Sequence, residues 1–205
     1  MQSVTGLSGA SFGRSLLVLG GARSGKSRHA QAVAEAVAGT AATGQGARLV
    51  FVATAQAFDD EMADRIARHK ADRDDRWQTV EAPLRLSDAL ATADSTGTIF
   101  LVDCLTLWLS NLLLAEASID REVDTLLATL SSLAGRVILV SNEVGSGIVP
   151  DNALARRFRD AAGVMHQRLA AALDTVDLVV AGLPQRLKAP SVPGRDTGLQ
   201  ALDIV

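Results

Sequence analysis

The sequence predicts one α/β domain built on a mostly parallel sheet with helices on both faces. Short apolar runs alternate with segments of helical spacing, which is typical of strands joined by crossover helices. The first apolar run passes directly into residues 20–27, which fit the pattern G-x-x-x-x-G-K-[ST] of a phosphate loop. With 205 residues, of which 48% are hydrophobic, the chain can bury one substantial core. The expected fold class is therefore the α/β fold of the P-loop NTPase type.

The glycine-rich segment has the residue types that a phosphate cradle needs. Gly20 and Gly25 permit the positive φ of a tight turn, so backbone N–H groups can point at an anion. Lys26 supplies a mobile positive charge for the β- and γ-phosphates, and the Ser27 hydroxyl is placed to ligate Mg²⁺. The helix that follows adds its unpaired N–H groups to the same site. The residues expected to contact a nucleotide are Gly20, Gly21, Ala22, Arg23, Ser24, Gly25, Lys26 and Ser27.

The other elements follow from the hydrophobic pattern along the chain. Buried strands are expected at 16–19, 49–53, 98–102, 136–140 and 177–182, with a short additional strand at 77–80. Helices are expected at 26–37, 59–76, 84–93, 105–115, 120–133 and 153–173. The segment 105–115 is apolar almost all round, so it is either a buried helix or one partly covered by another subunit.

Composition limits the partners and the compartment of the protein. The net charge of −3, without a basic run, gives no indication of a nucleic-acid partner. Cys104 is the only cysteine, so no disulfide can form within the chain, which is typical of a reducing cytoplasm. No apolar stretch reaches the roughly 18 residues of a spanning helix, so no membrane span is expected. We expect a flexible leader at 1–15, a single P-loop domain at 16–188 and a tail at 189–205.

Two strand ends offer further polar groups to the predicted site. Asp103 ends the run 98–102, and an acid at the tip of a buried strand beside a phosphate loop supplies the second half of a Mg²⁺ site, together with Ser27. Thr54 follows the run 49–53, and loops at the carboxyl ends of parallel strands line the ligand crevice. Both residues are therefore candidates for the site.

The residues alone leave two interpretations of His69 open. Arg65, Arg68, Lys70, Arg73 and Arg76 surround it in sequence, and such a cluster would lower the imidazole pKa and keep a nucleophile neutral. Alternatively, His69 packs beside Met62 and Ile66 on one helical face while the cations pair with nearby aspartates. Of the other histidines, His29 is expected to face away from Lys26 in a structural role, and His166 has no evident partner.

Several motifs together resemble the bifunctional adenosylcobinamide kinase and adenosylcobinamide-phosphate guanylyltransferase family of cobalamin biosynthesis. The resemblance covers residues 16–188, and its last motif is unusually specific. The motifs are GGARSGKS at 20–27, ATAQ at 53–56, DDEMADRIARHKADR at 59–73, W-x-T-x-E-x-P at 77–83, DCLT at 103–106 and SNEVGSGIVPDNALARRFRDAAG at 141–163.

The resemblance implies two successive reactions on a corrinoid. Adenosylcobinamide is phosphorylated with ATP or GTP, and GMP from GTP then passes through a covalent phosphoramidate on His69 to the adenosylcobinamide phosphate. The resemblance also implies a homotrimer, in which the helix at 105–115 would have a partner. Some members of the family have a second histidine just before the nucleophile, where this chain has Arg68. The implied nucleotide contacts beyond the phosphate loop are Ala53, Thr54, Ala55, Lys70, Ala71, Asp72, Arg73, Glu81 and Asp103, with Mg²⁺ on Ser27 and Asp103.

Two other functions compete with this one. A small-molecule kinase would use the phosphate loop without covalent chemistry, and His69 would then be structural. A nucleotide-dependent switch would report the bound nucleotide to a protein partner through the loops at 53–58 and 141–149. No switch-like motif accompanies the phosphate loop, so the sequence favours an enzyme.

Overall fold

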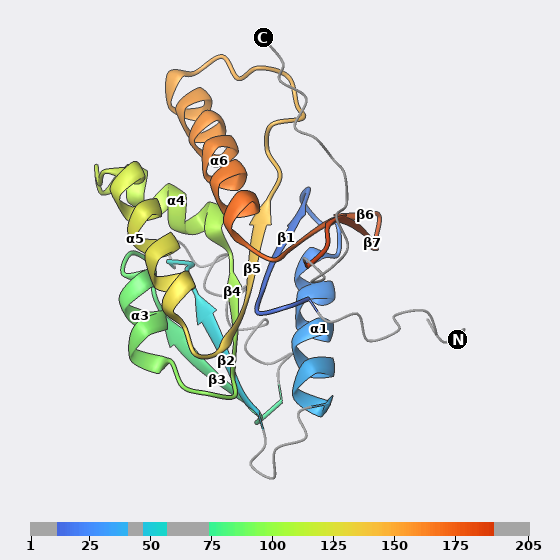
Figure 1. Ribbon diagram of the computed structural model, residues 1–205. Coiled ribbons are helices and arrows are strands. Elements are labelled where there is room, and N and C mark those ends of the chain that lie inside the picture. Colours follow the sequence, from blue (N-terminus) through green and yellow to red (C-terminus); the bar gives the residue numbers. More distant parts are fainter. Residues whose placement is uncertain (1–11, 41–46, 57–73, 191–205) are drawn as a thin grey trace.

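The computed structural model describes residues 12–40, 47–56 and 74–190, and places them in a seven-stranded sheet with helices on both of its faces (Figure 1). This confirms the fold class expected from the sequence. In chain order the elements are β1 (Ser15–Gly20), α1 (Lys26–Thr40), β2 (Arg48–Ala53), β3 (Trp77–Glu81), α3 (Leu86–Ala93), β4 (Thr98–Asp103), α4 (Leu105–Leu114), α5 (Ile119–Ser132), β5 (Arg136–Asn142), α6 (Ala153–Ala172), β6 (Thr175–Val180) and β7 (Leu183–Lys188).

The strands lie in the order β3-β2-β4-β5-β1-β6-β7. Every neighbouring pair is parallel except β6 and β7, which form an antiparallel hairpin. Because the first six strands run the same way, their carboxyl ends meet at one edge of the sheet. This order also inserts β5 between the phosphate-loop strand β1 and the Asp103 strand β4.

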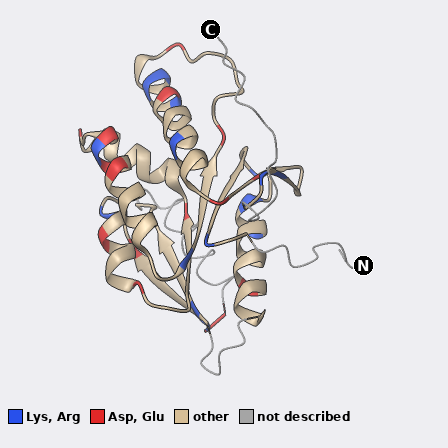
Figure 2. Ribbon diagram, viewed as in Figure 1, with Lys and Arg blue, Asp and Glu red and all other residues tan. Residues whose placement is uncertain are grey.

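Alternate residues of the strands enter two separate cores, one on each face of the sheet. The larger core packs strand residues such as Leu17 and Phe100 against α3, α4, α5 and α6. The smaller core packs Leu16 and Ile138 against Ala30 and other residues of α1. Of the helices labelled in Figure 1, α1 lies on one side of the strands and the other four lie on the opposite side. On the outer surface, α5 and α6 carry charges of both signs (Figure 2), and Arg168 bridges them by pairing with Asp124.

The structure corrects some of the boundaries expected from the sequence. Phe12 is buried at 1% exposure in the smaller core, so the folded part includes residues that were assigned to the leader. Residues 74–76 form a turn rather than the end of a helix. The strand β7 was not expected at all, since its sequence LPQRLK has no apolar run and its residues are largely exposed.

The apolar segment at 105–115 forms α4, and its own chain buries most of it. Trp108 is fully buried, and its indole Nε1 donates to the Leu84 carbonyl at 2.9 Å. Leu114, at the end of the helix, is 64% exposed. Covering this helix therefore does not require a second subunit. None of the helices in the described part of the chain is long and apolar enough to cross a membrane.

Candidate active site

The carboxyl edge of the sheet collects most of the described residues that the sequence singled out. Ala53 pairs with Glu81 on one side and with Asp103 on the other, while Gly20 pairs with Asn142 across β1 and β5. Four strand spacings separate β3 from β1, and each is about 4.8 Å, so Glu81 lies roughly 19 Å from Gly20 along the edge. An edge of this length can take an extended nucleotide, with the phosphate loop at one end and Glu81 at the other.

The phosphate loop has the backbone geometry of a wrapped anion site. Gly25 has φ +93°, and Arg23 has φ +55°, so the chain turns sharply before α1. A Cβ at Gly20 would come within 2.5 Å of the Ser24 hydroxyl and 2.6 Å of the Val179 carbonyl, so only glycine fits there. The tip of the loop at Gly21, Ala22 and Arg23 is exposed, and this leaves the surface that a phosphate would approach open to solvent.

Lys26 and Ser27 open α1 directly beneath this loop. The Lys26 side chain is almost fully buried, and its Nζ donates to the Gly21 carbonyl at 3.2 Å. The ammonium is thus held over the loop, where a phosphate oxygen could take the place of the carbonyl as its acceptor. Ser27 is half-buried in the first turn of the helix. The arrangement puts one mobile cation and one hydroxyl where a bound phosphate would meet the helix N-terminus.

The β6–β7 hairpin supports the phosphate loop from the far side. Gly182, in its turn, donates its N–H to the Ser24 carbonyl at 2.8 Å. Below the turn, Asp177 accepts from His29 at 3.0 Å and pairs with Arg186. Burial raises the pKa of Asp177, but the hydrogen bonds from His29 and Arg186 outweigh this and hold it below its ordinary value. His29 therefore ties the helix of the phosphate loop to the hairpin, which is a structural role.

Asp103 lies half-buried at the end of β4, and the intervening strand β5 separates it from the phosphate loop. The thiol of the next residue, Cys104, is affected by the charges of both Asp103 and Lys26. Burial raises the pKa of the Cys104 thiol, the charge of Asp103 raises it further, and the charge of Lys26 opposes them. The charges of Asp103 and Lys26 thus both act on the Cys104 thiol, in opposite directions.

Thr54 lies where the sequence suggested, but its hydroxyl is already used. It is fully buried, accepts from the Cys104 N–H at 2.8 Å and donates to the Cys104 carbonyl at 2.7 Å. Its carbonyl accepts from the amide of Asn111 at 2.8 Å, and the same amide donates to Pro83 at 2.9 Å. Thr54 and Asn111 thus hold together the loops after β2, β3 and β4, while Ala53 and Ala55 flank Thr54 on the edge.

Sequence reasoning missed a polar pair at the end of β5. His166 of α6 shares a hydrogen bond of 2.7 Å with the hydroxyl of Ser141, which is fully buried. Burial lowers the pKa of His166, and the nearby charge of Glu143 opposes that shift. Next along the strand, the Asn142 amide donates to the Thr106 hydroxyl at 2.8 Å. No sequence signal pointed to these contacts, because the partners come from elements far apart in the chain.

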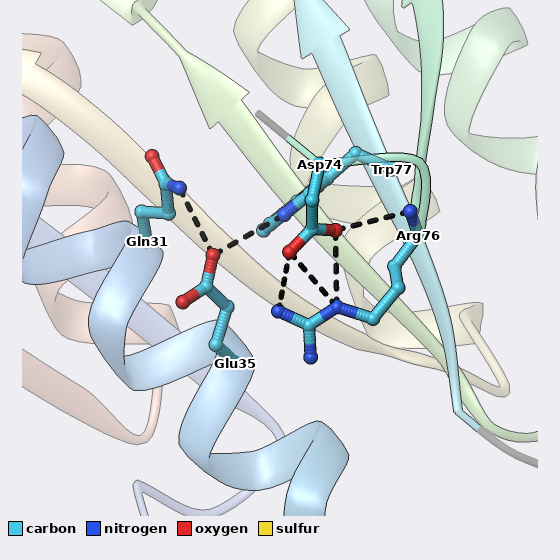
Figure 3. A network of polar contacts seen from close by, with 5 residues as sticks. All are labelled: Gln31, Glu35, Asp74, Arg76 and Trp77. Carbon is cyan, nitrogen blue, oxygen red and sulfur yellow. Dashed lines mark hydrogen bonds and ion pairs between the residues drawn. The ribbon is translucent and has the colours of Figure 1, made fainter. Parts of the chain in front are cut away.

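The proposed nucleophile His69 lies outside the described residues, as do Lys70, Ala71, Asp72 and Arg73. The description resumes at Asp74, in a turn where Arg76 pairs with the Asp74 carboxylate at 2.6 Å. Figure 3 shows Trp77 and Gln31 both reaching Glu35 of α1, at 3.3 and 2.9 Å. The chain from Asp74 to Trp77 is therefore anchored to the helix of the phosphate loop.

The donor set at this edge is suited to Mg²⁺ bound together with a phosphate. Ser27 offers a hydroxyl and Asp103 a carboxylate, and both are hard oxygen ligands of the kind that Mg²⁺ prefers. Within residues 12–40, 47–56 and 74–190, no group of three or more His, Cys, Asp or Glu side chains could hold a metal ion by itself. The residues thus fit an ion that completes its coordination with substrate phosphates and water.

The fold and this edge define the chain as an α/β protein of the P-loop NTPase-like class. It belongs to the family described as cobinamide kinase / cobinamide phosphate guanyltransferase, whose model matches residues 16–187. It is 49% identical over 174 residues to the "Bifunctional adenosylcobalamin biosynthesis protein CobP" of Pseudomonas aeruginosa, covering 84% of this chain and 96% of that protein.

Two further relatives carry the name "Bifunctional adenosylcobalamin biosynthesis protein CobU". The one from Salmonella typhimurium is 44% identical over 189 residues, and the one from Escherichia coli is 39% identical over 188 residues. Each alignment covers 84% of this chain and 99% of the relative. A solved structure from Pyrococcus horikoshii OT3 covers 86% of both chains with a TM-score of 0.47 at 10% identity, which is too distant to support an argument.

Proposed function

We propose that this protein catalyses two successive transfers in adenosylcobalamin biosynthesis. In the first, the hydroxyl oxygen of adenosylcobinamide attacks the γ-phosphorus of ATP or GTP, and a nucleoside diphosphate and a proton leave. In the second, a nitrogen of His69 attacks the α-phosphorus of GTP and releases pyrophosphate. An oxygen of adenosylcobinamide phosphate then attacks the guanylylated histidine, so the P–N bond breaks, adenosylcobinamide-GDP forms and His69 is restored.

The single observation that supports this proposal most strongly is the phosphate loop in its place at the carboxyl edge. The Lys26 ammonium lies over the exposed turn at 3.2 Å from the Gly21 carbonyl, ready to exchange that acceptor for a phosphate oxygen. In-line phosphoryl transfer depends mainly on positioning and charge stabilisation, which a loop of backbone N–H groups and one cation supply. The family match over residues 16–187 connects this loop to cobinamide chemistry.

The other proposed roles divide along the same edge. Lys26 supplies positive charge to the triphosphate, and Ser27 and Asp103 would hold a Mg²⁺ ion that adds further positive charge there. The nucleotide also contacts Glu81 and the backbone of residues 53–55. The cations beside His69, namely Lys70 and Arg73, stabilise the charge on the transferred phosphate. We further propose one catalytic domain over residues 16–188, working in the cytoplasm as a homotrimer.

The test uses GTP labelled at the α-phosphate. Purified wild-type protein is incubated with this GTP and Mg²⁺, and the chain is then examined for label that is labile to acid and stable to alkali, as expected of a phosphoramidate. We expect label on the wild type and none on a His69→Ala variant. Added adenosylcobinamide phosphate should discharge the label as adenosylcobinamide-GDP.

Two outcomes would contradict the proposal. Equal label on the wild type and on His69→Ala would exclude His69 as the nucleophile. Absence of label from both, with adenosylcobinamide still phosphorylated, would leave a kinase that lacks the covalent step. The kinase reaction is therefore measured in parallel, with nucleoside triphosphate labelled at the γ-phosphate.

A further inference from the structure

Three large aliphatic side chains are exposed on and just after the loop that leaves the proposed site at the end of β5. Ile148 is 97% exposed, Val149 61% and Leu154 57%; they lie in the loop between β5 and α6 and in the first turn of α6. We call these three residues the aliphatic patch. Figure 1 shows this loop extending beyond the end of β5 to the far end of α6. Exposed aliphatic side chains that gather in a patch mark a binding surface more often than isolated ones do.

Hydrogen bonds pin the loop that carries the patch at both ends. At its start, the Glu143 carboxylate accepts from Gly145 N–H at 2.6 Å and from the Ser146 hydroxyl at 2.7 Å. At its end, Arg156 donates to the carbonyls of Pro150 and Asp151 at 2.9 and 2.7 Å. The backbone on either side of Ile148 and Val149 is thus held by hydrogen bonds, so a ligand that binds these side chains does not bear the full cost of ordering the loop.

The loop begins at the phosphate site. It leaves the end of β5, the strand between β1 and β4, and Glu143 N–H donates to the Gly20 carbonyl at 3.0 Å. The patch therefore begins a few residues along the chain from Glu143, which contacts the first glycine of the phosphate loop. When the hydroxyl of a substrate reaches a γ-phosphate bound to the phosphate loop, the rest of that substrate extends over the surface around the loop.

We propose that the aliphatic patch docks the corrin macrocycle of cobinamide, which rests on the proposed function. A corrin is a large ring whose edge carries methyl groups beside its amide side chains, and the methyl groups match exposed Ile and Val side chains, whereas a nucleotide is an anion with a polar sugar. Only 3% of the residues are aromatic, so a broad apolar substrate has to be held mainly by aliphatic contacts. Three side chains supply much less than the roughly 800 Å² that each partner contributes to a standard protein interface, so the patch alone is too small to form one.

The test is a double substitution, Ile148→Ser with Val149→Ser. We expect the Kd for cobinamide, measured by equilibrium dialysis using its corrin absorbance, and the KM of the kinase step for cobinamide to rise at least roughly tenfold, because two aliphatic contacts are lost. The Kd for GTP and the labelling of the chain by α-labelled GTP need no corrinoid, so both should match the wild type. Equal labelling also shows that the variant is folded.

Two control variants accompany the double substitution. Leu187→Ser removes an aliphatic side chain that is 55% exposed on β7, away from the patch, and should leave the affinity for cobinamide unchanged. Ile148→Leu with Val149→Ile keeps an aliphatic surface and should retain most of the affinity. Light scattering of each variant gives its oligomeric state.

Three results would overturn the docking proposal. In the first, the double serine variant binds cobinamide as the wild type does. In the second, it loses its oligomeric state, which would make the patch an interface between copies. In the third, wild-type protein fails to bind cobinamide at all, and this would overturn the proposed function as well. In the first two results the wild-type protein still acts on cobinamide, so they contradict the docking proposal without contradicting the proposed function.

Discussion

His166 is a buried imidazole whose pKa is lowered by burial, with Glu143 opposing the shift. In the unfolded chain the same group has a pKa of about 6.5, so on acidification the unfolded state takes up the proton first. We therefore expect the free energy of unfolding to fall as the pH drops from about 7 to about 5. Urea unfolding at several pH values measures this, and a His166→Gln variant should show a smaller change. An equal pH dependence in both proteins would contradict the assignment.

The side-chain amide of Asn111 donates hydrogen bonds to two loops, at the Thr54 and Pro83 carbonyls. Replacing it with alanine leaves the Thr54 and Pro83 carbonyls without their amide donor in a buried place. We expect Asn111→Ala to lower the free energy of unfolding by about 2 kcal/mol. Urea unfolding checks this, with Ser131→Ala on the exposed face of α5 as the control, expected to stay within about 0.5 kcal/mol of the wild type.

At the scale of single residues, the sequence predicted those whose chemistry is tied to a local pattern. The phosphate loop was predicted because Gly, Lys and Ser occur at a fixed spacing, and Asp103 was predicted as a metal ligand because it ends an apolar run. The contacts of Thr54 with Cys104 and of Ser141 with His166 were not found. Their partners lie 50 and 25 residues apart, and only the tertiary fold brings them together.

At the scale of elements, the parallel strands were predictable because both of their faces are buried. Their continuous apolar runs stand out from the neighbouring helices, as the fully buried pattern of β4 shows except at Asp103. The antiparallel strand β7 gave no such signal, since it lies exposed at the edge of the sheet. The helix α4 was predicted as either buried or partly covered by another subunit, and the structure shows that its own chain buries most of it.

The hairpin turn between β6 and β7 contains a strained residue. Ala181 has φ +52°, a left-handed conformation that costs a residue with a Cβ about 1 kcal/mol. We expect Ala181→Gly to raise the free energy of unfolding by about 0.5 to 1 kcal/mol, because glycine adopts this conformation without strain. Thermal unfolding monitored by circular dichroism measures the change. Ala128→Gly in α5 is the control and should destabilise the protein by a similar amount. A lower Tm for Ala181→Gly would show that relief of strain is not the dominant effect.

At the scale of the whole molecule, one sheet edge carries a single described phosphate loop for two proposed reactions. If both use that loop, Lys26→Ala should slow cobinamide phosphorylation and guanylylation alike, each by about 100-fold or more, because a cation that stabilises transferred phosphate is lost. Assays with γ-labelled and α-labelled GTP measure the two rates separately. His69→Ala should abolish only the second reaction. Normal phosphorylation by Lys26→Ala would indicate a separate site for the first.

The edge strand β7 also bears on how the protein behaves at high concentration. Open sheet edges recruit other strands and seed aggregates, and proteins commonly block them with proline and charged residues. Pro184 has no N–H to offer to an incoming strand, and Lys188 adds a positive charge at the end of the same short strand, while the charge of Arg186 is paired with Asp177. Pairing of two protein molecules through the edges of their sheets is therefore disfavoured at β7. We expect this edge not to seed fibrous aggregates in a concentrated solution of the protein.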